Sequence, residues 1–222
     1  MKENIRKYVF SIGGDLCGFA GIDCFKDAPK GFSPQNIWDD CKSVISFAVA
    51  LPKGVLQVSP RLIYAHYNQM SCLQTDEISF SIAKYLEQTY NCKAIPIPCD
   101  SPYEYWDAGN MEGRGILSMK HIAMKAGLGS IGKNSLFACR EYGNAVTLGC
   151  VLSDLELASD NVMQKLCVDG CNRCEESCPA SAIRGGFVNQ KKCREHTYGK
   201  TARGFDTVDC NVCRTVCPLN HL

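Results

Sequence analysis

The sequence lacks a long hydrophobic run, an apolar N-terminal segment and an excess of either charge. Its longest apolar stretch, residues 44–51, is far too short to cross a bilayer as a helix. The first residues, MKENIRKYVF, contain no hydrophobic run of secretory length, so we expect no signal peptide. With 24 basic and 23 acidic side chains among 222 residues, the strongly basic surface of many nucleic-acid-binding proteins is also missing. We therefore expect a cytoplasmic protein with no membrane partner.

Cysteine, in contrast, is abundant, with 16 residues in the chain. Disulfides are rare in a reducing cytoplasm, where clustered cysteines more often bind metal or take part in redox chemistry. Eight of the 16 are scattered over residues 1–166, mostly in apolar stretches, and we interpret them as packing residues because a free cysteine behaves as a small hydrophobe. The other eight lie within residues 167–222 and carry the candidate site.

Short apolar segments alternate with helical patterns over the first 160 residues. Strand-forming runs cover residues 18–25, 44–51, 92–99 and the stretch from 144 onward. The prolines within 92–99 predict a strand at a sheet edge, since proline cannot donate to the ladder. The chain is thus predicted to be of the α/β (α+β) class, with a larger domain over residues 1–162 and a small cysteine-rich domain over residues 163–222.

Three helices are expected between these strands. Ser33 followed by proline is typical of a helix start, and so is the Ser59-Pro60 pair. The second of these opens a stretch to about Tyr90 that predicts two helices or one broken helix. A third helix is expected over residues 118–126, ending at Gly127.

The clustered cysteines repeat a Cys-x2-Cys-x3-Cys-Pro pattern. The segments CVDGCNRCEESCP and DCNVCRTVCP contain seven of them, and the eighth lies between the segments. In two-cluster ferredoxins the cysteine that precedes the proline ligates the other cluster. We therefore predict two 4Fe-4S clusters, one bound by Cys167, Cys171, Cys174 and Cys217, the other by Cys178, Cys193, Cys210 and Cys213.

Alternatives to this assignment are weaker. Zinc ribbons use paired Cys-x2-Cys knuckles without the repeated Cys-x3-Cys-Pro extension. A thioredoxin-like redox pair would leave six cysteines unexplained. Cys167 and Cys171 are separated by three residues where two are usual, and Gly170 could let the loop absorb the extra residue. If it does not, the first cluster has only three protein thiolates.

Residues 127–132, GLGSIG, match the G-x-G-x-x-G pattern. That pattern binds dinucleotides when it follows a strand and opens a helix, whereas here it follows a predicted helix. We therefore do not assign nicotinamide binding to it and expect a helix C-cap followed by a tight turn.

Three stretches together resemble the epoxyqueuosine reductase family: AGLGSIGKNSL (126–136), LGCVLSDLEL (148–157) and the two cysteine segments with Cys193 between them. The resemblance implies reduction of epoxyqueuosine in tRNA with cobalamin and two 4Fe-4S clusters. It implies an N-terminal domain similar to flavin-binding nitroreductases and shared with corrinoid reductive dehalogenases, followed by a ferredoxin-like domain. The implied cluster ligands agree with the crossover set. The family's cobalamin pocket borders the glycine loop, which marks Gly127, Gly129, Gly132, Lys133 and Asn134 as candidate cofactor-binding residues.

The sequence departs from the family at the position of its proton-donating aspartate. Gap-free counting places Gly113 there, and Ile116 at the position of the proline that follows two residues later. We interpret the neighbouring Glu112 as a solvated charge and His121 as a surface or packed histidine. The catalytic residue is therefore unassigned.

The sequence also ends soon after Cys217, without the helical-repeat region that the family uses with tRNA. We therefore interpret the chain as a short paralogue and do not expect tRNA as its substrate.

Three functional hypotheses remain. The first is an oxidoreductase that takes electrons from a redox donor such as ferredoxin or flavodoxin and passes them through the clusters to cobalamin, which acts on a small molecule. The second replaces cobalamin by FMN. The third is a non-catalytic electron carrier or partner subunit.

Overall fold

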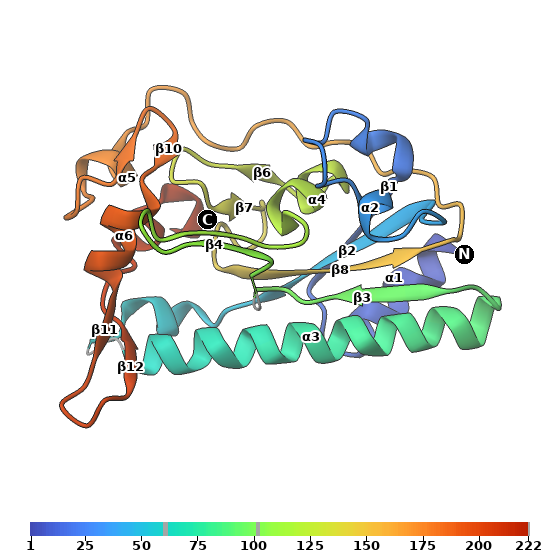
Figure 1. Ribbon diagram of the computed structural model, residues 1–222, viewed down its shortest axis with the longest axis horizontal. Helices are drawn as coiled ribbons and strands as arrows, with labels where there is room; N and C mark the ends of the chain where they lie inside the picture. The colour runs from blue at the N-terminus through green and yellow to red at the C-terminus, as the bar shows by residue number, and fades with distance from the viewer. Residues whose placement is uncertain (60–61, 101–102, 222) are drawn as a thin grey trace.

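A four-stranded sheet organises the computed structural model, which describes residues 1–59, 62–100 and 103–221 (Figure 1). The strand order is β1-β2-β8-β3, and every neighbouring pair is antiparallel. The four strands are β1 (Leu16–Gly21), β2 (Ser43–Ala50), β3 (Ala94–Ile97) and β8 (Val146–Ser153). The architecture is thus mixed α/β, and the antiparallel pairing excludes a parallel βαβ arrangement for this sheet.

Helices cover both faces of this sheet (Figure 1). On one face lie α1 (Lys2–Ser11) and the long α3 (Leu62–Tyr90), which pack against the Phe19 and Phe47 rings. On the other face lies α4 (Met119–Lys125), whose Ile122 packs in a core with β2 and β8. Burial from both sides explains why these strands have continuous apolar runs in place of an apolar–polar alternation.

The structure confirms most of the expected elements and refines their ends. Of the two prolines in the predicted strand, Pro96 lies in β3 at the sheet edge, opposite Val151, and Pro98 follows the strand. The stretch to Tyr90 is one unbroken helix, although Pro60 of its expected start lies outside the described residues. The helix at Ser33 is a single turn, α2 (Pro34–Ile37), closed by a capping box with Asn36.

The predicted end of α4 is also confirmed. Gly127 follows the helix with a φ of +76°, and the amide of Leu128 donates to the carbonyl of Ala123. This is the left-handed C-cap that glycine adopts without strain.

The remaining elements are short. Those that precede β8 in the chain are η1 (Ile22–Phe25), η2 (Lys53–Gln57), β4 (Tyr105–Asp107), β5 (Glu112–Arg114), β6 (Ser130–Ile131) and β7 (Phe137–Ala138). After it they are α5 (Arg173–Glu176), β9 (Ile183–Arg184), β10 (Phe187–Val188), α6 (Gln190–Thr197), β11 (Tyr198–Lys200), β12 (Asp206–Val208), α7 (Val212–Thr215) and η3 (Pro218–His221). Figure 1 shows this second group gathered at one end of the sheet. Among the described helices, none is long and apolar enough to cross a membrane.

We expect Phe47→Ala to lower the free energy of unfolding by about 3–5 kcal/mol, because the fully buried ring fills the space between β2 and α3. Phe80→Ala removes the same ring from the outer side of α3, where it is 59% exposed, and should change stability by about 0.5 kcal/mol or less. Urea denaturation of the anaerobically purified protein measures both. Equal losses would contradict the described packing of α3.

Candidate functional site: two cysteine groups beside a large cavity

The two cysteine segments fold into two copies of the same turn. Each contains a four-residue helix, α5 or α7, and these two helices pack against each other. The amide of Cys178 donates to the Glu175 carbonyl at 3.3 Å, and the amide of Cys217 donates to the Arg214 carbonyl at 3.3 Å. A proline follows both cysteines and stops the helical turn. The repeated sequence therefore produces a repeated backbone.

The first group of thiols surrounds a small cavity of about 30 Å³. Its four cysteines are those of the first predicted cluster: Cys167, Cys171, Cys174 and Cys217. Burial raises the pKa of Cys174 and of Cys217, and the nearby Cys167 thiol raises both further. Gly170 has a φ of +78°, so the longer loop turns back and brings Cys167 to the same space.

The second group gathers around Cys213. The pKa of this thiol is raised to about 11, mainly by burial; the neighbouring thiols of Cys193, Cys210 and Cys178 add to the rise, and the Arg214 charge opposes it. The eight thiols thus lie in two groups of four. Cluster binding by these groups stays a prediction.

The spacing of the thiols bears on the kind of metal centre. Among the described residues, no three His, Cys, Asp or Glu side chains come close enough to hold a single metal ion. A zinc ion would draw four sulfurs to about 3.7 Å from one another, because each Zn–S bond is about 2.3 Å long. Each cysteine of a 4Fe-4S cube binds a different iron, so the four sulfurs enclose a larger volume. A zinc ion and a cube therefore require different sulfur spacings.

The glycine loop joins the sheet to both cysteine segments. Lys133 Nζ donates to the Cys171 carbonyl at 2.8 Å and to Asn172 Oδ1 at 2.9 Å. Asn134 Nδ2 donates to the Cys213 carbonyl at 3.0 Å. These two side chains therefore hold one segment from each half of the repeat.

The glycines of this loop allow close backbone approach. A Cβ on Gly129 would overlap the Ala138 carbonyl, and one on Gly127 would crowd the Asn161 carbonyl. Gly132, Lys133 and Asn134 line the small cysteine cavity. None of the five candidate cofactor-binding residues lines the large cavity between β8 and α4.

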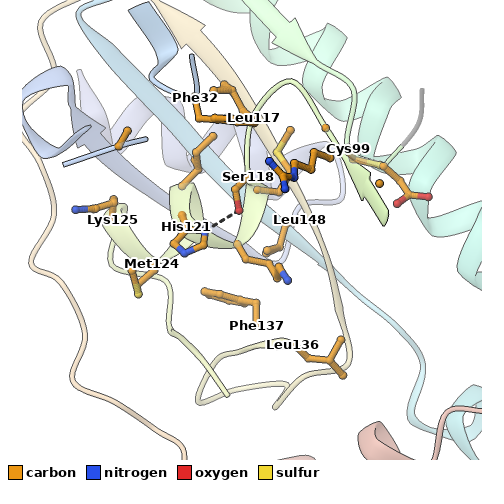
Figure 2. A pocket seen from close by; sticks show the side chains of 18 of the residues that line it. Phe32, Cys99, Leu117, Ser118, His121, Met124, Lys125, Leu136, Phe137 and Leu148 are labelled. Carbon is orange, nitrogen blue, oxygen red and sulfur yellow. Dashed lines mark hydrogen bonds between the residues drawn. The ribbon is translucent and has the colours of Figure 1, made fainter. Parts of the chain in front are cut away.

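A cavity of about 830 Å³ lies between β8, α4 and the residues around Gly113 (Figure 2). Its wall is largely apolar, with the side chains of Phe32, Leu117, Leu136, Phe137 and Leu148. Cofactor and ligand pockets have volumes of roughly 300–1,000 Å³ and mostly apolar walls with a few polar groups. This cavity meets both criteria.

The charged groups of this wall are mostly cationic. Figure 2 shows Ser118 and His121 pointing toward each other, with 2.7 Å between Ser118 Oγ and His121 Nδ1. Desolvation lowers the pKa of His121, and the charges of Lys120 and Lys125 lower it further, which favours a neutral imidazole at pH 7. Burial also lowers the pKa of Lys120, whose Nζ donates to the Ser135 carbonyl at 2.8 Å.

His121, which the sequence presented as a surface or packed histidine, is thus exposed at the rim of this cavity. Gly113 lines the wall where the family resemblance places an aspartate. Glu112 lies outside the wall and pairs with Arg114 at 4.0 Å.

One asparagine connects the two cavities. Asn144 lines both the cysteine cavity and the large cavity. Arg214, directly after Cys213, lines the large cavity and donates from Nη1 to the Asn144 carbonyl. Asn220 Nδ2 donates to Asn144 Oδ1 at 2.8 Å. Sequence reasoning missed these three residues because they carry no metal-ligand or catalytic motif.

Helix α6, which carries Cys193, holds the β4–β5 hairpin beside the large cavity. The Arg194 guanidinium lies over the rings of Trp106, Tyr103 and Tyr198 at 5.2, 5.5 and 5.8 Å. The amide of Gly113 donates to Gln190 Oε1 at 3.2 Å. The hairpin that supplies Gly113 to the cavity wall is therefore fastened to a cysteine-bearing helix.

Comparison with known proteins shows which proteins the chain is similar to. No protein-family model matches the sequence. The epoxyqueuosine reductase of Gloeobacter violaceus is 34% identical over 230 residues, covering 94% of this chain and 66% of that enzyme. The enzyme of Listeria monocytogenes is 31% identical over 259 residues, covering 100% and 65%. That of Bacillus subtilis is 25% identical over 256 residues, covering 99% and 64%. The chain thus spans about two thirds of the length of these relatives.

Solved structures show the same fold. The epoxyqueuosine reductase of Streptococcus thermophilus superimposes with a TM-score of 0.72 at 22% identity, covering 100% of this chain and 66% of that one. A catabolic reductive dehalogenase in complex with 3-bromo-4-hydroxybenzoic acid gives 0.75 at 15% identity, covering 98% and 31%. The fold is therefore one shared by epoxyqueuosine reductases and reductive dehalogenases. By sequence, the chain is an epoxyqueuosine reductase-like protein.

We expect Arg194→Ala to release the β4–β5 hairpin from α6, because the guanidinium is the group that three aromatic rings share. Of the two tryptophans, Trp38 is replaced by phenylalanine so that fluorescence reports Trp106 alone. Acrylamide quenching of Trp106 should increase in Arg194→Ala and stay unchanged in Lys192→Ala, a cation on the same helix for which no ring contact is seen. Unchanged quenching in Arg194→Ala would show that the hairpin is held by other contacts.

Proposed function

We propose that the chain is an oxidoreductase that receives electrons at two 4Fe-4S clusters and delivers them to an acceptor in the large cavity. The observation that carries this proposal is the wall formed by Asn144 and Arg214, which separates the thiol groups from the cavity by a single layer of residues. The relatives are reductases by name, in agreement with this direction of electron flow.

In this proposal the cysteine-rich part, residues 163–222, is a ferredoxin-like two-cluster domain, and residues 1–162 form a nitroreductase-like cofactor domain. The ligands of the first cluster are Cys167, Cys171, Cys174 and Cys217, and those of the second are Cys178, Cys193, Cys210 and Cys213. Each segment gives one ligand to the cluster of the other, so both clusters depend on α5 packing against α7. This interleaving favours a short path between the clusters.

The large cavity is the proposed site of the organic cofactor, with cobalamin as the first candidate. Cobalamin, when bound, supplies a low-valent cobalt that can reduce a substrate. The apolar side chains of Leu117, Phe137 and Leu148 offer the flat walls that a macrocycle requires. Gly132, Lys133 and Asn134 of the glycine loop line the neighbouring cysteine cavity, which shares Asn144 with this one. FMN, a smaller group, is the alternative occupant.

A proton for the reduction has to come from groups other than a carboxylate at Gly113. The Ser118–His121 pair at the rim can hold a proton on either imidazole nitrogen, with the serine hydroxyl fixing the other. Lys120, with its pKa lowered by burial, is the second proton carrier of this wall.

The proposed substrate and the proposed electron donor rest on different observations. The relatives' name makes epoxyqueuosine the first substrate class to test, and one structural neighbour was solved with an epoxyqueuosine-modified tRNA stem loop. A small molecule is the alternative. Residues 184–203 contain six basic side chains and one acidic one and include Cys193. Such a surface suits an acidic donor of the ferredoxin or flavodoxin type.

Iron analysis tests the cluster assignment. Anaerobically purified protein should contain about eight irons per chain, the content of two 4Fe-4S clusters. Cys174→Ser and Cys213→Ser should each remove one cluster and leave about four irons, since each changes a different thiol group. Cys24→Ser, outside both groups, should keep all eight. Zinc in place of iron, or a full iron content in either cluster variant, would disprove the assignment.

Cofactor binding tests the large cavity. We expect cobalamin to co-elute with the cluster-loaded protein in anaerobic gel filtration. Leu136→Trp should abolish this co-elution, because the larger indole occupies part of the cavity that Leu136 lines. Leu73→Trp on the exposed side of α3, where the leucine is 53% exposed, should bind as the wild type does. Co-elution of FMN instead supports the flavin alternative. If neither binds while the clusters stay intact, the chain is an electron carrier.

A further inference from the structure

Two cysteines outside the cluster groups lie against each other at the surface. Cys72 is on α3, and Cys99 follows β3. The Cys99 thiol donates to the Cys72 carbonyl at 3.4 Å. The Cys99 amide donates to Asp76 Oδ1 at 2.9 Å, which fixes the segment after β3 against the helix. The two thiols are therefore held in mutual reach by long-range contacts.

These thiols are accessible to small molecules. Both are only partly buried, and both line a groove of about 910 Å³ between α3 and the β11–β12 hairpin. Cys99 also lines the large cavity, and Figure 2 shows it at the side of that cavity next to α3. The pair thus lies in the wall between two solvent-reachable spaces.

The two thiols are not equivalent. The Cys99 thiol donates its hydrogen to the Cys72 carbonyl at 3.4 Å, and this bond holds the proton on Cys99. The neighbouring Cys99 thiol lowers the pKa of Cys72, while burial acts in the opposite direction. A thiolate is the nucleophile in sulfur exchange, so Cys72 is the better placed of the two to attack first.

A second neighbouring pair shows what an unreactive arrangement looks like. Cys41 and Cys150 also lie close enough to interact, but they are 1% and 0% exposed in the core beneath α4. Burial raises the pKa of both. This pair is sealed from solvent and serves as an internal control.

We propose that Cys72 and Cys99 form a redox-active dithiol that closes to a disulfide in exchange with a low-molecular-weight disulfide. The Cys72 thiolate attacks one sulfur of that disulfide, which releases one thiolate and leaves a mixed disulfide on Cys72. The Cys99 thiol then attacks the Cys72 sulfur and releases the second thiolate. The two protons lost by the protein thiols go to the two released thiolates. One protein dithiol is oxidised and one disulfide is reduced to two thiols.

Closure of this bond has a structural consequence. It links α3 covalently to the segment after β3 and removes the Cys99 thiol from the wall of the large cavity. The effect on a cavity-bound acceptor rests on the proposed function, whereas the exchange itself requires only the two thiols.

The test uses the cluster-loaded full chain in anaerobic glutathione buffers of graded ratio, followed by an acid quench, alkylation under denaturing conditions and peptide mass spectrometry. The visible absorbance of the clusters shows that they survive. We expect the peptides of Cys72 and Cys99 to become linked as glutathione disulfide increases, while Cys41 and Cys150 remain alkylatable. Cys99→Ser should stop at a glutathione adduct on Cys72, and Cys72→Ser should leave Cys99 unmodified.

Two outcomes would overturn the proposal. Cys72 and Cys99 could both stay alkylatable in the most oxidising buffer, or the wild type could accumulate the glutathione adduct to the same extent as Cys99→Ser. Failure of the proposed function is separately visible, because cobalamin and FMN binding are measured on the reduced protein and iron content before any oxidation.

Discussion

The cysteine segments lack a core of their own, and this constraint governs the rest of the structure. Helices α5, α6 and α7 contain no buried residue, and Ala182 and Ile183 are the buried apolar side chains among the described residues after 162. Segments with so little apolar burial need other sources of folding free energy. In the proposed function, thiolate–iron bonds supply one such source, because metal binding to a site that the unfolded chain lacks is itself folding free energy. The hydrogen bonds of Lys133 and Asn134 to the segments' carbonyls supply the other.

Strand β8 links the cysteine segments to the four-stranded sheet and its core. Successive residues of a strand face opposite sides of a sheet. Leu148 accordingly faces the large cavity, whereas Gly149 faces α3, where a Cβ would overlap the Phe47 ring and the Thr75 methyl group. The residues just before β8 lead to Asn144 and its contacts with Arg214 and Asn220. One strand thus holds the long helix, forms the cavity wall and reaches the cysteine segments.

Local patterns in the sequence were sufficient to predict many elements of the fold. Apolar runs located the strands, prolines placed β3 at an edge, and the repeat of the cysteine segments predicted the two thiol groups. The strand order could not be predicted, because β8 pairs with β2 across about a hundred residues and no local signal specifies that partner. The Asn144–Arg214 wall and the Arg194 ring contacts were missed for the same reason. Cys72 and Cys99 were interpreted as hydrophobes because their proximity depends on α3 packing against β3.

The charge of the large cavity wall favours a reductase over a passive carrier. Among the described residues its basic side chains are Arg114, Lys120, Lys125 and Arg214, and its acidic ones are Asp27 and Asp100. Asp27 is neutralised by Lys125 at 2.7 Å and Arg114 pairs with Glu112 at 4.0 Å, which leaves Lys120 and Arg214 against Asp100 and a net positive charge on the wall. Electrons that arrive from a cluster leave negative charge on the acceptor, and fixed positive groups in a largely apolar site stabilise that charge. A carrier that passes electrons to an external protein has no need of such a wall. The absence of a carboxylate at Gly113 adds to the same positive field, so that position favours reduction even though it removes one source of protons.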